Sequence, residues 1–345
     1  MGITEENFKK YNSIENTYRE VFVNKIFSQY PSANHMKWAI TEKIHGTNIQ
    51  ISYDGKDTLI GGRTHVIESD EKYYNIQTIA SQYFYNVQQL FITIKDTLNE
   101  NIEKVIVFGE LFGGSYPCKE IERDNNATRV QKGVWYCPHN DIIFFDIHCV
   151  YKDGSGQYLP VITFEDLMEK VRLPFQKSIV VNSLEEALKY PNDELSEVYK
   201  RYNLPALEDN IREGVVIKPY LEDLWLGQSR VILKNKNERF AEKTHEKKVN
   251  LDVTLNYSEQ LKKALVEVEP YCTENRMRNV ISHIGEVTLQ DIGKVIGMTN
   301  KDVLDDFNKE TGLLNTIEKA EQKIVSKHVN FLISKIVKST LLREL

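Results

Sequence analysis

The stretch TEKIHGTN, residues Thr41–Asn48, is the part of the sequence most informative about the fold. It places Lys43 three residues before Gly46, with Glu42 and His45 beside them. An amine is a nucleophile only when neutral, and the unperturbed lysine pKa of about 10.4 opposes that form. A nearby cation or metal ion favours the neutral form, and a glycine lets the backbone approach a phosphate. By itself such a tetrapeptide is more typical of a surface loop, so its meaning depends on the rest of the chain.

Several apolar runs of strand length elsewhere in the chain end in charged residues. They are VIVFGE (Val105–Glu110), IIFFDI (Ile142–Ile147), REGVVIKP (Arg212–Pro219) and VILKNK (Val231–Lys236), and Arg63 follows the pair Gly61-Gly62. Runs of Val, Ile and Phe of this length predict buried β-strands. Charged side chains are rarely buried without a partner, so their position at strand ends indicates a site rather than a core.

Taken in order, these phrases resemble a known set of motifs. KIHG (Lys43–Gly46), FGE (Phe108–Glu110), FFD (Phe144–Asp146), EGVVIK (Glu213–Lys218) and KNK (Lys234–Lys236) look like motifs I, III, IIIa, IV and V of the covalent nucleotidyltransferase superfamily. That superfamily contains ATP-dependent DNA ligases, RNA ligases and mRNA capping enzymes. DNA ligases and capping enzymes favour Asp where this chain has His45 and Arg where it has Asn48. The phrase EKIHGTN is instead similar to the RNA ligase 2 family, which includes phage double-strand RNA ligases and kinetoplastid RNA-editing ligases.

The C-terminal part of the chain resembles the same family. Asn275–Gly285 and Asp291–Gly297 are similar to the C-terminal domain of the phage enzyme. The irregular order of strand-length and helix-length segments before residue 240 indicates an α+β fold. The resemblance implies an antiparallel-sheet nucleotidyltransferase domain (an ATP-grasp-like ligase domain) followed by a small all-α domain. We therefore expect an adenylyltransferase domain over residues 1–245, a linker over 246–257 and a helical domain over 258–345.

Helix-length segments and helix signals can be placed more closely. Asn75–Leu98 and Leu184–Tyr202 have helical length and spacing. In the tail, Thr288–Asp291 carries a capping pattern, and Gly297 is expected to end the helix that follows. Thr299–Asp302 is expected to cap the next helix.

The resemblance also implies a reaction. The enzyme would be an ATP-dependent RNA ligase that seals 3′-hydroxyl/5′-phosphate nicks in duplex RNA or in an RNA/DNA hybrid. Lys43 would attack the α-phosphate of ATP and hold AMP, which then passes to the 5′-phosphate end. Lys234 and Lys236 would favour the neutral Lys43 amine and neutralise charge on the phosphate. Mg²⁺, or Mn²⁺ in its place, would act with them.

Other residues take their expected roles from the same motifs. Phe145 and Val216 would hold the adenine between an aromatic and an aliphatic face. Glu213 and Glu110 are the candidate metal ligands, and Arg276 and Asp302 the candidate residues for substrate RNA. The full set of expected nucleotide-binding residues is Glu42, Ile44, Asn48, Arg63, Glu110, Phe145, Val216, Lys218, Lys234 and Lys236.

Composition limits the partners. Of 345 residues, 44 are Lys or Arg and 50 are Asp or Glu, which gives a net charge of −6. Any nucleic-acid site must therefore be a local patch. No apolar run reaches about eighteen residues, so no membrane partner is expected. The four cysteines form no C-x-x-C pair and are expected to be free thiols. We expect a monomer located in the cytoplasm.

Several alternatives stay open at this point. A DNA ligase or a guanylyltransferase would share the chemistry, and a catalytically idle RNA-binding relative would share the fold. Cys137, His139, His148 and Cys149 lie within thirteen residues and could bind zinc. However, His148 and Cys149 are adjacent and would point to opposite faces of a strand. The role of His45 is not indicated by the sequence.

Overall fold

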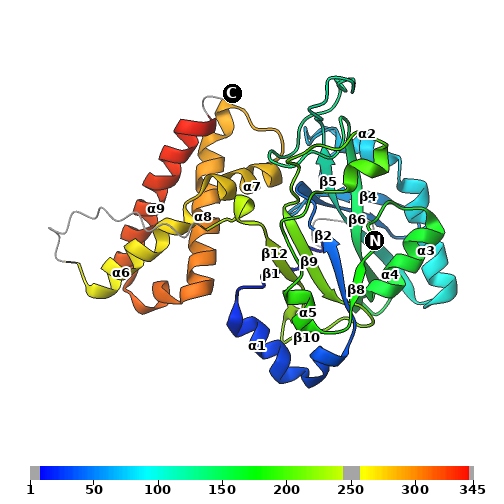
Figure 1. The fold of residues 1–345 in the computed structure, drawn as a ribbon, viewed down its shortest axis with the longest axis horizontal. Coiled ribbons are helices and arrows are strands. Elements are labelled where there is room, and N and C mark those ends of the chain that lie inside the picture. Colours follow the sequence, from blue (N-terminus) through cyan, green and yellow to red (C-terminus); the bar gives the residue numbers. More distant parts are fainter. Residues whose placement is uncertain (1–7, 244–256, 342–345) are drawn as a thin grey trace. The chain divides into compact units, whose positions relative to one another are not determined.

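Two antiparallel sheets and the helices that cover them form the larger part of the protein (Figure 1). The structure is a computed structural model that describes residues 8–243 and 257–341. The chain divides into a unit Met1–Arg239 and a unit Phe240–Leu345. This division precedes the boundary expected at residue 245, and apart from Tyr257 the expected linker lies outside the described residues.

The first sheet has the strand order β1-β12-β9-β2-β8. All neighbours are antiparallel except β1 and β12. The strands are β1 (Glu15–Asn16), β12 (Leu233–Lys236), β9 (Gly214–Pro219), β2 (Trp38–Glu42) and β8 (Ile179–Val181). One face packs Trp38 and Ile217 against helices α1 (Glu20–Gln29) and α5 (Leu184–Leu188). Because side chains alternate along a strand, the neighbouring residues point to the opposite face.

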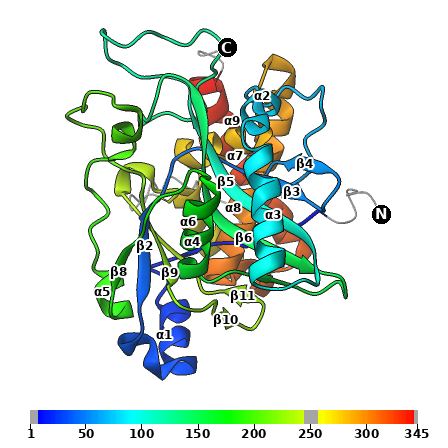
Figure 2. The ribbon, with the colours of Figure 1, turned by 90° about the vertical axis from the view of Figure 1, so that its right-hand side faces the viewer.

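The second sheet has the order β4-β3-β5-β6-β7 and is antiparallel throughout. The strands are β4 (Thr58–Gly61), β3 (Thr47–Tyr53), β5 (Ile102–Gly113), β6 (Asn140–Tyr151) and β7 (Gly156–Tyr158). Helices α3 (Phe84–Thr97) and α4 (Val161–Val171) lie side by side over one face, with α2 (Ile76–Ser81) near one end (Figure 2). These helices bury Ile49, Val107 and Phe144 in the largest core, so the other face is left for the site.

Some expected elements differ in length. The expected helix Asn75–Leu98 is interrupted between α2 and α3 at Gln82-Tyr83. The expected helix Leu184–Tyr202 was wrong, because only α5 forms there and a 3₁₀ turn covers Val198–Tyr202. Of the run Val231–Lys236, only Leu233–Lys236 forms a strand. A two-stranded ribbon of β10 (Trp225–Leu226) and β11 (Ser229–Arg230) precedes it.

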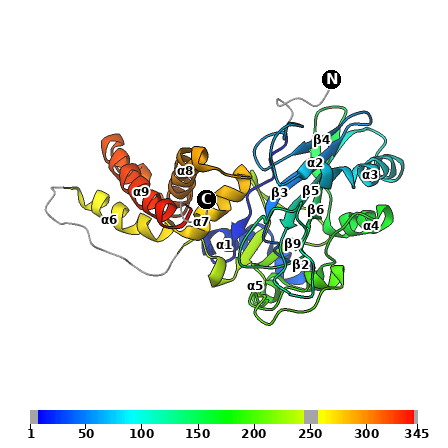
Figure 3. The same ribbon diagram turned by 90° about the horizontal axis from the view of Figure 1, so that it is seen from above.

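The second unit is helical in its described residues. It contains α6 (Glu259–Val268), α7 (Glu274–Ile284), α8 (Ile292–Thr311) and α9 (Lys319–Thr340), and Figure 3 shows α8 and α9 alongside one another. Val295, Phe307 and Val329 are among the fully buried residues of its core. No described helix of either unit is both long enough and apolar enough to cross a membrane.

The capping pattern of the tail is confirmed in one place and wrong in another. Thr288 and Asp291 form a capping box just before α8. Gly297 does not end that helix, which continues to Thr311 and stops at Gly312 in the left-handed conformation. Thr299 therefore lies inside α8, where its hydroxyl donates to the carbonyl of Val295 at 2.8 Å.

Candidate active site

Two strands of the first sheet supply one face of the site. In the antiparallel pairing of β9 with β12, Val216 lies opposite Lys234, and Gly214 lies opposite Lys236. Residues directly opposite share a face, so Val216, Lys234 and Lys236 point the same way, as does Lys218 two residues along β9. Val215 and Ile217 are fully buried on the other face. The alternation that buries the aliphatic residues thus places the lysines together.

The loop Lys43–Gly46 joins β2 of the first sheet to β3 of the second. The backbone N–H of Lys43 donates to the carbonyl of Gly214 at 2.9 Å, which ties the loop to β9. A side chain at Gly46 would place its Cβ 2.1 Å from the carbonyl oxygen of Leu111 on β5. The glycine therefore allows the loop to lie directly against β5, whereas the sequence predicted an approach to a phosphate.

Glu213 is the centre of an ion cluster that contains Lys43, His45 and Lys236, here called the Glu213 cluster. Lys43 Nζ lies 2.7 Å from Oε2 of Glu213, and Lys236 Nζ lies 2.8 Å from Oε1. His45 Nδ1 lies 3.3 Å from Oε2. Burial by itself would raise the pKa of Glu213, but Lys236, Lys43 and His45 hold this pKa well below its usual range. The cluster gives His45 a position that the sequence did not predict.

Glu110 and Asn48 bring the second sheet to the site. They lie opposite each other on β5 and β3 and therefore share a face. Burial and the nearby Glu213 raise the pKa of Glu110 to about 7, although Lys43 and Arg63 oppose the shift. These interactions place Arg63 and Glu110 close to the Glu213 cluster. A carboxyl group with this pKa is ready to exchange its proton for a cation near neutral pH.

A β-bulge decides which aromatic residue of FFD faces the site. On β5, Phe108 lies opposite Asp146 and Gly109 lies opposite Phe144, which leaves Phe145 as the extra residue of β6. Phe144 is fully buried in the core, whereas Phe145 is half-buried beside Val216 and Lys218. A bulge shifts the alternation of a strand by one residue, so Phe145 and Asp146 both stay on the site face. The positions of Phe145 and Val216 agree with the expected adenine clamp.

Asp146 accepts hydrogen bonds from three buried or half-buried donors. Lys218 Nζ donates at 2.8 Å, Arg230 Nη1 at 2.5 Å and the Tyr11 hydroxyl at 2.7 Å. Burial opposes ionisation, but Arg230 and Lys218 lower the pKa of Asp146 to about 2. Lys218 also donates to the carbonyl of Phe145 at 2.9 Å. Lys218 and Asp146 thus hold Phe145 in place.

Glu42 and Ile44 flank Lys43 in sequence. Ile44 is buried, and burial raises the pKa of Glu42 to about 7 despite hydrogen bonding to Ser196. Within the described residues, Oε1 of Glu42 is buried and accepts no hydrogen bond. A buried acceptor without a partner is costly, so this atom is suited to a ligand donor.

Two residues that sequence reasoning missed hold the loop of Lys43. The backbone N–H of His45 donates to the Tyr136 hydroxyl at 2.8 Å, and Nε2 of Gln131 donates to the carbonyl of Gly46 at 3.4 Å. Both side chains are buried. They come from the long segment between β5 and β6, roughly ninety residues away in sequence. No pattern along the chain indicates such contacts, because each is a single residue in irregular structure.

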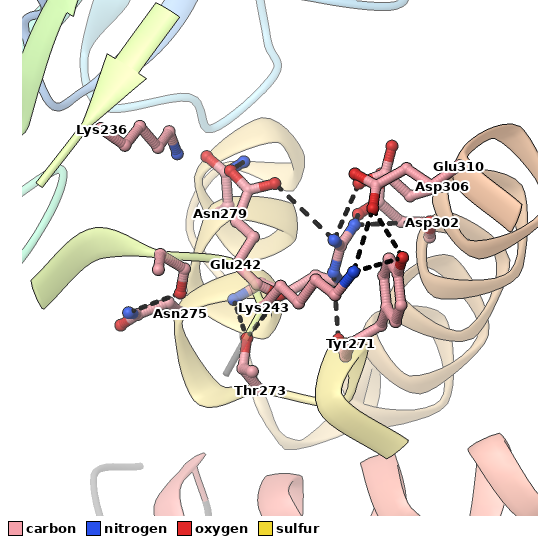
Figure 4. Close-up of polar contacts among 12 residues, drawn as sticks. Lys236, Glu242, Lys243, Tyr271, Thr273, Asn275, Asn279, Asp302, Asp306 and Glu310 are labelled. Atoms are coloured by element: carbon pink, nitrogen blue, oxygen red, sulfur yellow. Dashed lines mark hydrogen bonds and ion pairs between the residues drawn. The ribbon is translucent and has the colours of Figure 1, made fainter. Parts of the chain in front are cut away.

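Arg276 and Asp302 contact each other inside the helical unit. Arg276 is 2% exposed, and its guanidinium lies 2.6 Å from Asp302, 2.8 Å from Asp306 and 4.0 Å from Glu242. These four residues are here called the Arg276 cluster, and Figure 4 shows the three carboxylates pointing to a common centre. The charge of Arg276 is paired with carboxylates of its own unit, and its expected contact with RNA stays a prediction. Asp302 is half-exposed, and its role toward RNA stays a prediction.

The residues that could hold a metal ion are Glu110 and Glu213. No group of three or more His, Cys, Asp or Glu side chains with metal-binding geometry occurs in the described parts of the chain. Mg²⁺ often uses only one or two carboxylates, together with water and substrate phosphates. Glu110 fits that requirement, whereas both oxygens of Glu213 are held by lysines. The four residues considered for zinc are arranged differently. The Cys137 thiol donates to the carbonyl of His139, and Cys149 is buried in the core on the face away from His148.

Two family models match this chain, and a known RNA-editing ligase is similar to most of it. A family model described as RNA ligase matches residues 36–236, and one described as T4 RNA ligase 2 C-terminal matches residues 255–335. The mitochondrial RNA-editing ligase 2 of Trypanosoma brucei brucei is 22% identical over 362 residues, which cover 88% of this chain and 84% of that protein.

Solved structures of Naegleria gruberi RNA ligase mutants are also similar. One with ATP and Mn is 15% identical with a TM-score of 0.45, and one with AMP and Mn is 15% identical with a TM-score of 0.43. Each match covers 68% of this chain and 57% of that chain, a little over half its length. The first family match alone covers more than half of the residues of this chain. Together the two family matches show that the chain belongs to the RNA ligase family, in the RNA ligase 2 branch.

Proposed function

We propose that this RNA ligase seals 3′-hydroxyl/5′-phosphate nicks in duplex RNA, using ATP and a lysyl-AMP intermediate on Lys43. The observation that carries the proposal is the Glu213 cluster. It holds a lysine amine, half-exposed on a tied loop, beside a second lysine and a buried carboxylate. The unit of residues 1–239 would carry out adenylylation, and both units would be needed to seal a nick.

The first step would transfer AMP to the protein. The Lys43 amine, after losing a proton, attacks the α-phosphorus of ATP, a P–N bond forms and pyrophosphate leaves. An ammonium group has no lone pair, so the ion pair between Lys43 and Glu213 has to open before attack. Lys236 keeps one oxygen of Glu213 neutralised when this happens, and Lys234 faces the same side of the sheet. A divalent cation at Glu110 would neutralise charge on the triphosphate.

The adenosine would lie between Phe145 and Val216. Both side chains are half-buried and face the site, and the free oxygen of Glu42 is available to accept from the adenine amino group. Asn48 and Arg63 would contact the sugar and phosphates. In the later steps the 5′-phosphate of the nick takes the AMP from Lys43, and the 3′-hydroxyl then displaces AMP to close the strand.

The decisive test is label transfer from α-³²P ATP. We expect a radioactive protein band, stable to base and labile to acid as a phosphoramidate is, and no band with Lys43→Ala. Lys56→Ala, a change at an exposed lysine of the same unit, is the control and should label normally. Retained labelling of the Lys43→Ala variant would refute the nucleophile. Label transfer from GTP instead would favour a guanylyltransferase.

The substrate is tested separately. Nicked RNA, nicked DNA and hybrid duplexes, offered side by side, should show closure that is fastest when the nicked strand is RNA. Equal closure of nicked DNA would contradict the preference. The monomeric state and the cytoplasmic location stay predictions, to be checked by light scattering and by fractionation.

A further inference from the structure

The long segment between β5 and β6 carries a stacked pair that the reaction described above does not use. The guanidinium carbon of Arg129 lies 3.7 Å from the centroid of the Trp135 ring. Both side chains are half-exposed. A guanidinium at this distance lies over the aromatic face and forms a cation–π contact.

The pair is held rigidly. The side chain of Asn210 holds the backbone of Trp135 with two hydrogen bonds. Its Oδ1 accepts from the backbone N–H of Trp135 at 2.8 Å, and its Nδ2 donates to the backbone carbonyl of Trp135 at 2.7 Å. Nε of Arg129 donates to the carbonyl of Gln131 at 3.0 Å. A surface group that is already ordered loses little conformational entropy on binding. Rigid aromatic and arginine side chains at a surface are typical of binding sites rather than of solvent-exposed loops.

Two residues that neighbour the pair contact the loop Lys43–Gly46. Trp135 is adjacent in sequence to Tyr136, whose hydroxyl accepts from the backbone of His45. Consecutive Cα atoms are about 3.8 Å apart. The Cα atom of Trp135 is therefore about that far from the Cα atom of Tyr136, whose side chain contacts the Lys43 loop. Gln131, which accepts from Arg129, reaches the same loop at Gly46.

We propose that Arg129 and Trp135 form a stacking surface for a nucleobase of the RNA, next to the end that is being joined. Bases stack on aromatic rings and on guanidinium planes, and each such contact contributes substantially to binding. Here the guanidinium carbon lies over the ring, and Nε donates to the carbonyl of Gln131, so the pair presents an aromatic ring and a guanidinium together. The proposal rests on the proposed function and adds a substrate contact to it.

The test separates this contact from adenylylation, which needs no RNA. We expect Trp135→Leu and Arg129→Gln to label normally with α-³²P ATP and to raise the KM for nicked RNA about tenfold. Trp135→Phe, which keeps a flat ring, should recover most of the affinity. Arg129→Lys, which keeps the charge and loses the plane, should behave like Arg129→Gln. Tyr85→Ala, at a 69% exposed aromatic of α3, is the control and should change neither measurement.

Each result decides the matter. Normal labelling with an unchanged KM in both Trp135→Leu and Arg129→Gln would overturn the stacking surface and leave the ligase function intact. Recovery by Arg129→Lys would also overturn it, in favour of a phosphate contact. If Trp135→Leu fails to fold, the KM of Arg129→Gln and tryptophan fluorescence test the proposal instead. RNA should quench the emission of the wild type more than that of Trp135→Phe, and equal quenching would count against the proposal. Absence of labelling in the wild type would instead contradict the proposed function.

Discussion

The two units of this protein bury charge in opposite ways. In the first unit, one buried carboxylate, Glu213, is surrounded by Lys43, Lys236 and His45. In the second, one buried guanidinium, Arg276, is surrounded by Asp302, Asp306 and Glu242. The first arrangement leaves excess positive charge, which an anionic triphosphate can use. The second leaves excess negative charge around its one cation.

The difference teaches what each cluster is for. The amine of Lys43 can leave Glu213, because Lys236 stays behind to neutralise the carboxylate. Arg276 has no comparable freedom, since it is 2% exposed and also donates from Nε to the carbonyl of Tyr271 at 3.1 Å. The Glu213 cluster is therefore suited to chemistry. The Arg276 cluster is suited to holding α7 and α8 together, and its variants sharpen the comparison.

The largest expected effect is that of Glu213→Gln. A neutral amide cannot hold two ammonium groups, so Lys43 and Lys236 lose their positions and adenylylation should fall by at least about 100-fold. Single-turnover label transfer measures this rate. Glu238→Gln, at an exposed carboxylate just after β12, is the control. A loss smaller than about threefold in Glu213→Gln would mean that the cluster does not position the nucleophile.

Arg276→Met should affect stability and sealing without affecting the first step. Removing the cation leaves three carboxylates without their partner, which should lower the free energy of unfolding of the helical unit by about 3 kcal/mol. Denaturant unfolding measures this loss, and label transfer should stay within about twofold of wild type. Arg278→Met, which breaks the pair with Glu274, should cost under about 1 kcal/mol. Equal losses in the two variants would show that burial of Arg276 is not what matters.

The pKa of Glu110, raised to about 7, predicts a pH dependence of metal binding. Below pH 7 the carboxyl is mostly protonated, so Mg²⁺ has to displace a proton. The apparent affinity for Mg²⁺ should rise about fivefold between pH 6 and pH 7 and level off above pH 8, at about ten times its value at pH 6. In the absence of metal, the stability that this neutral carboxyl contributes should be complete below about pH 4.5 and lost as the pH rises through 7.

Isothermal titration with Mg²⁺ across this pH range checks the dependence. Glu110→Gln should bind the metal weakly and with no change between pH 6 and pH 8. A pH-dependent affinity that persists in Glu110→Gln would assign the titration to another group.

The smallest expected effect is that of Tyr136→Phe. It removes the acceptor of the His45 N–H and keeps the ring, which should slow adenylylation by about fivefold, the equivalent of about 1 kcal/mol. Tyr202→Phe, which removes a buried hydroxyl bonded to Asp141, is the matched control. If the two variants slow label transfer equally, Tyr136 acts only through stability.

Much of the site could be predicted from the sequence because its residues lie in short phrases at strand ends. The residue types and their spacing can be recognised within each of the phrases KIHG, EGVVIK and KNK. The structure brings one residue of each phrase together, namely Lys43, Glu213 and Lys236. Phe145 could be preferred to Phe144, but the reason is a bulge that depends on the register of β5 against β6. The prediction that a helix ends at Gly297 was wrong, since α8 continues through this residue. A glycine inside a helix costs only about 1 kcal/mol, and the packing of α8 outweighs this cost.

The sequence by itself determined the family, the phrases that supply the candidate site and the α+β order of elements, since these depend on residue types and their spacing along the chain. Only the tertiary structure decided that Tyr136 and Gln131 hold the Lys43 loop, that Arg276 is an interior cation, and that Arg129 stacks on Trp135 beside the site. The physical reason is that burial and pairing of a charge depend on neighbours from other elements. A lysine at a strand end and an arginine in a helix look equally exposed in the sequence, and packing alone makes one accessible and encloses the other.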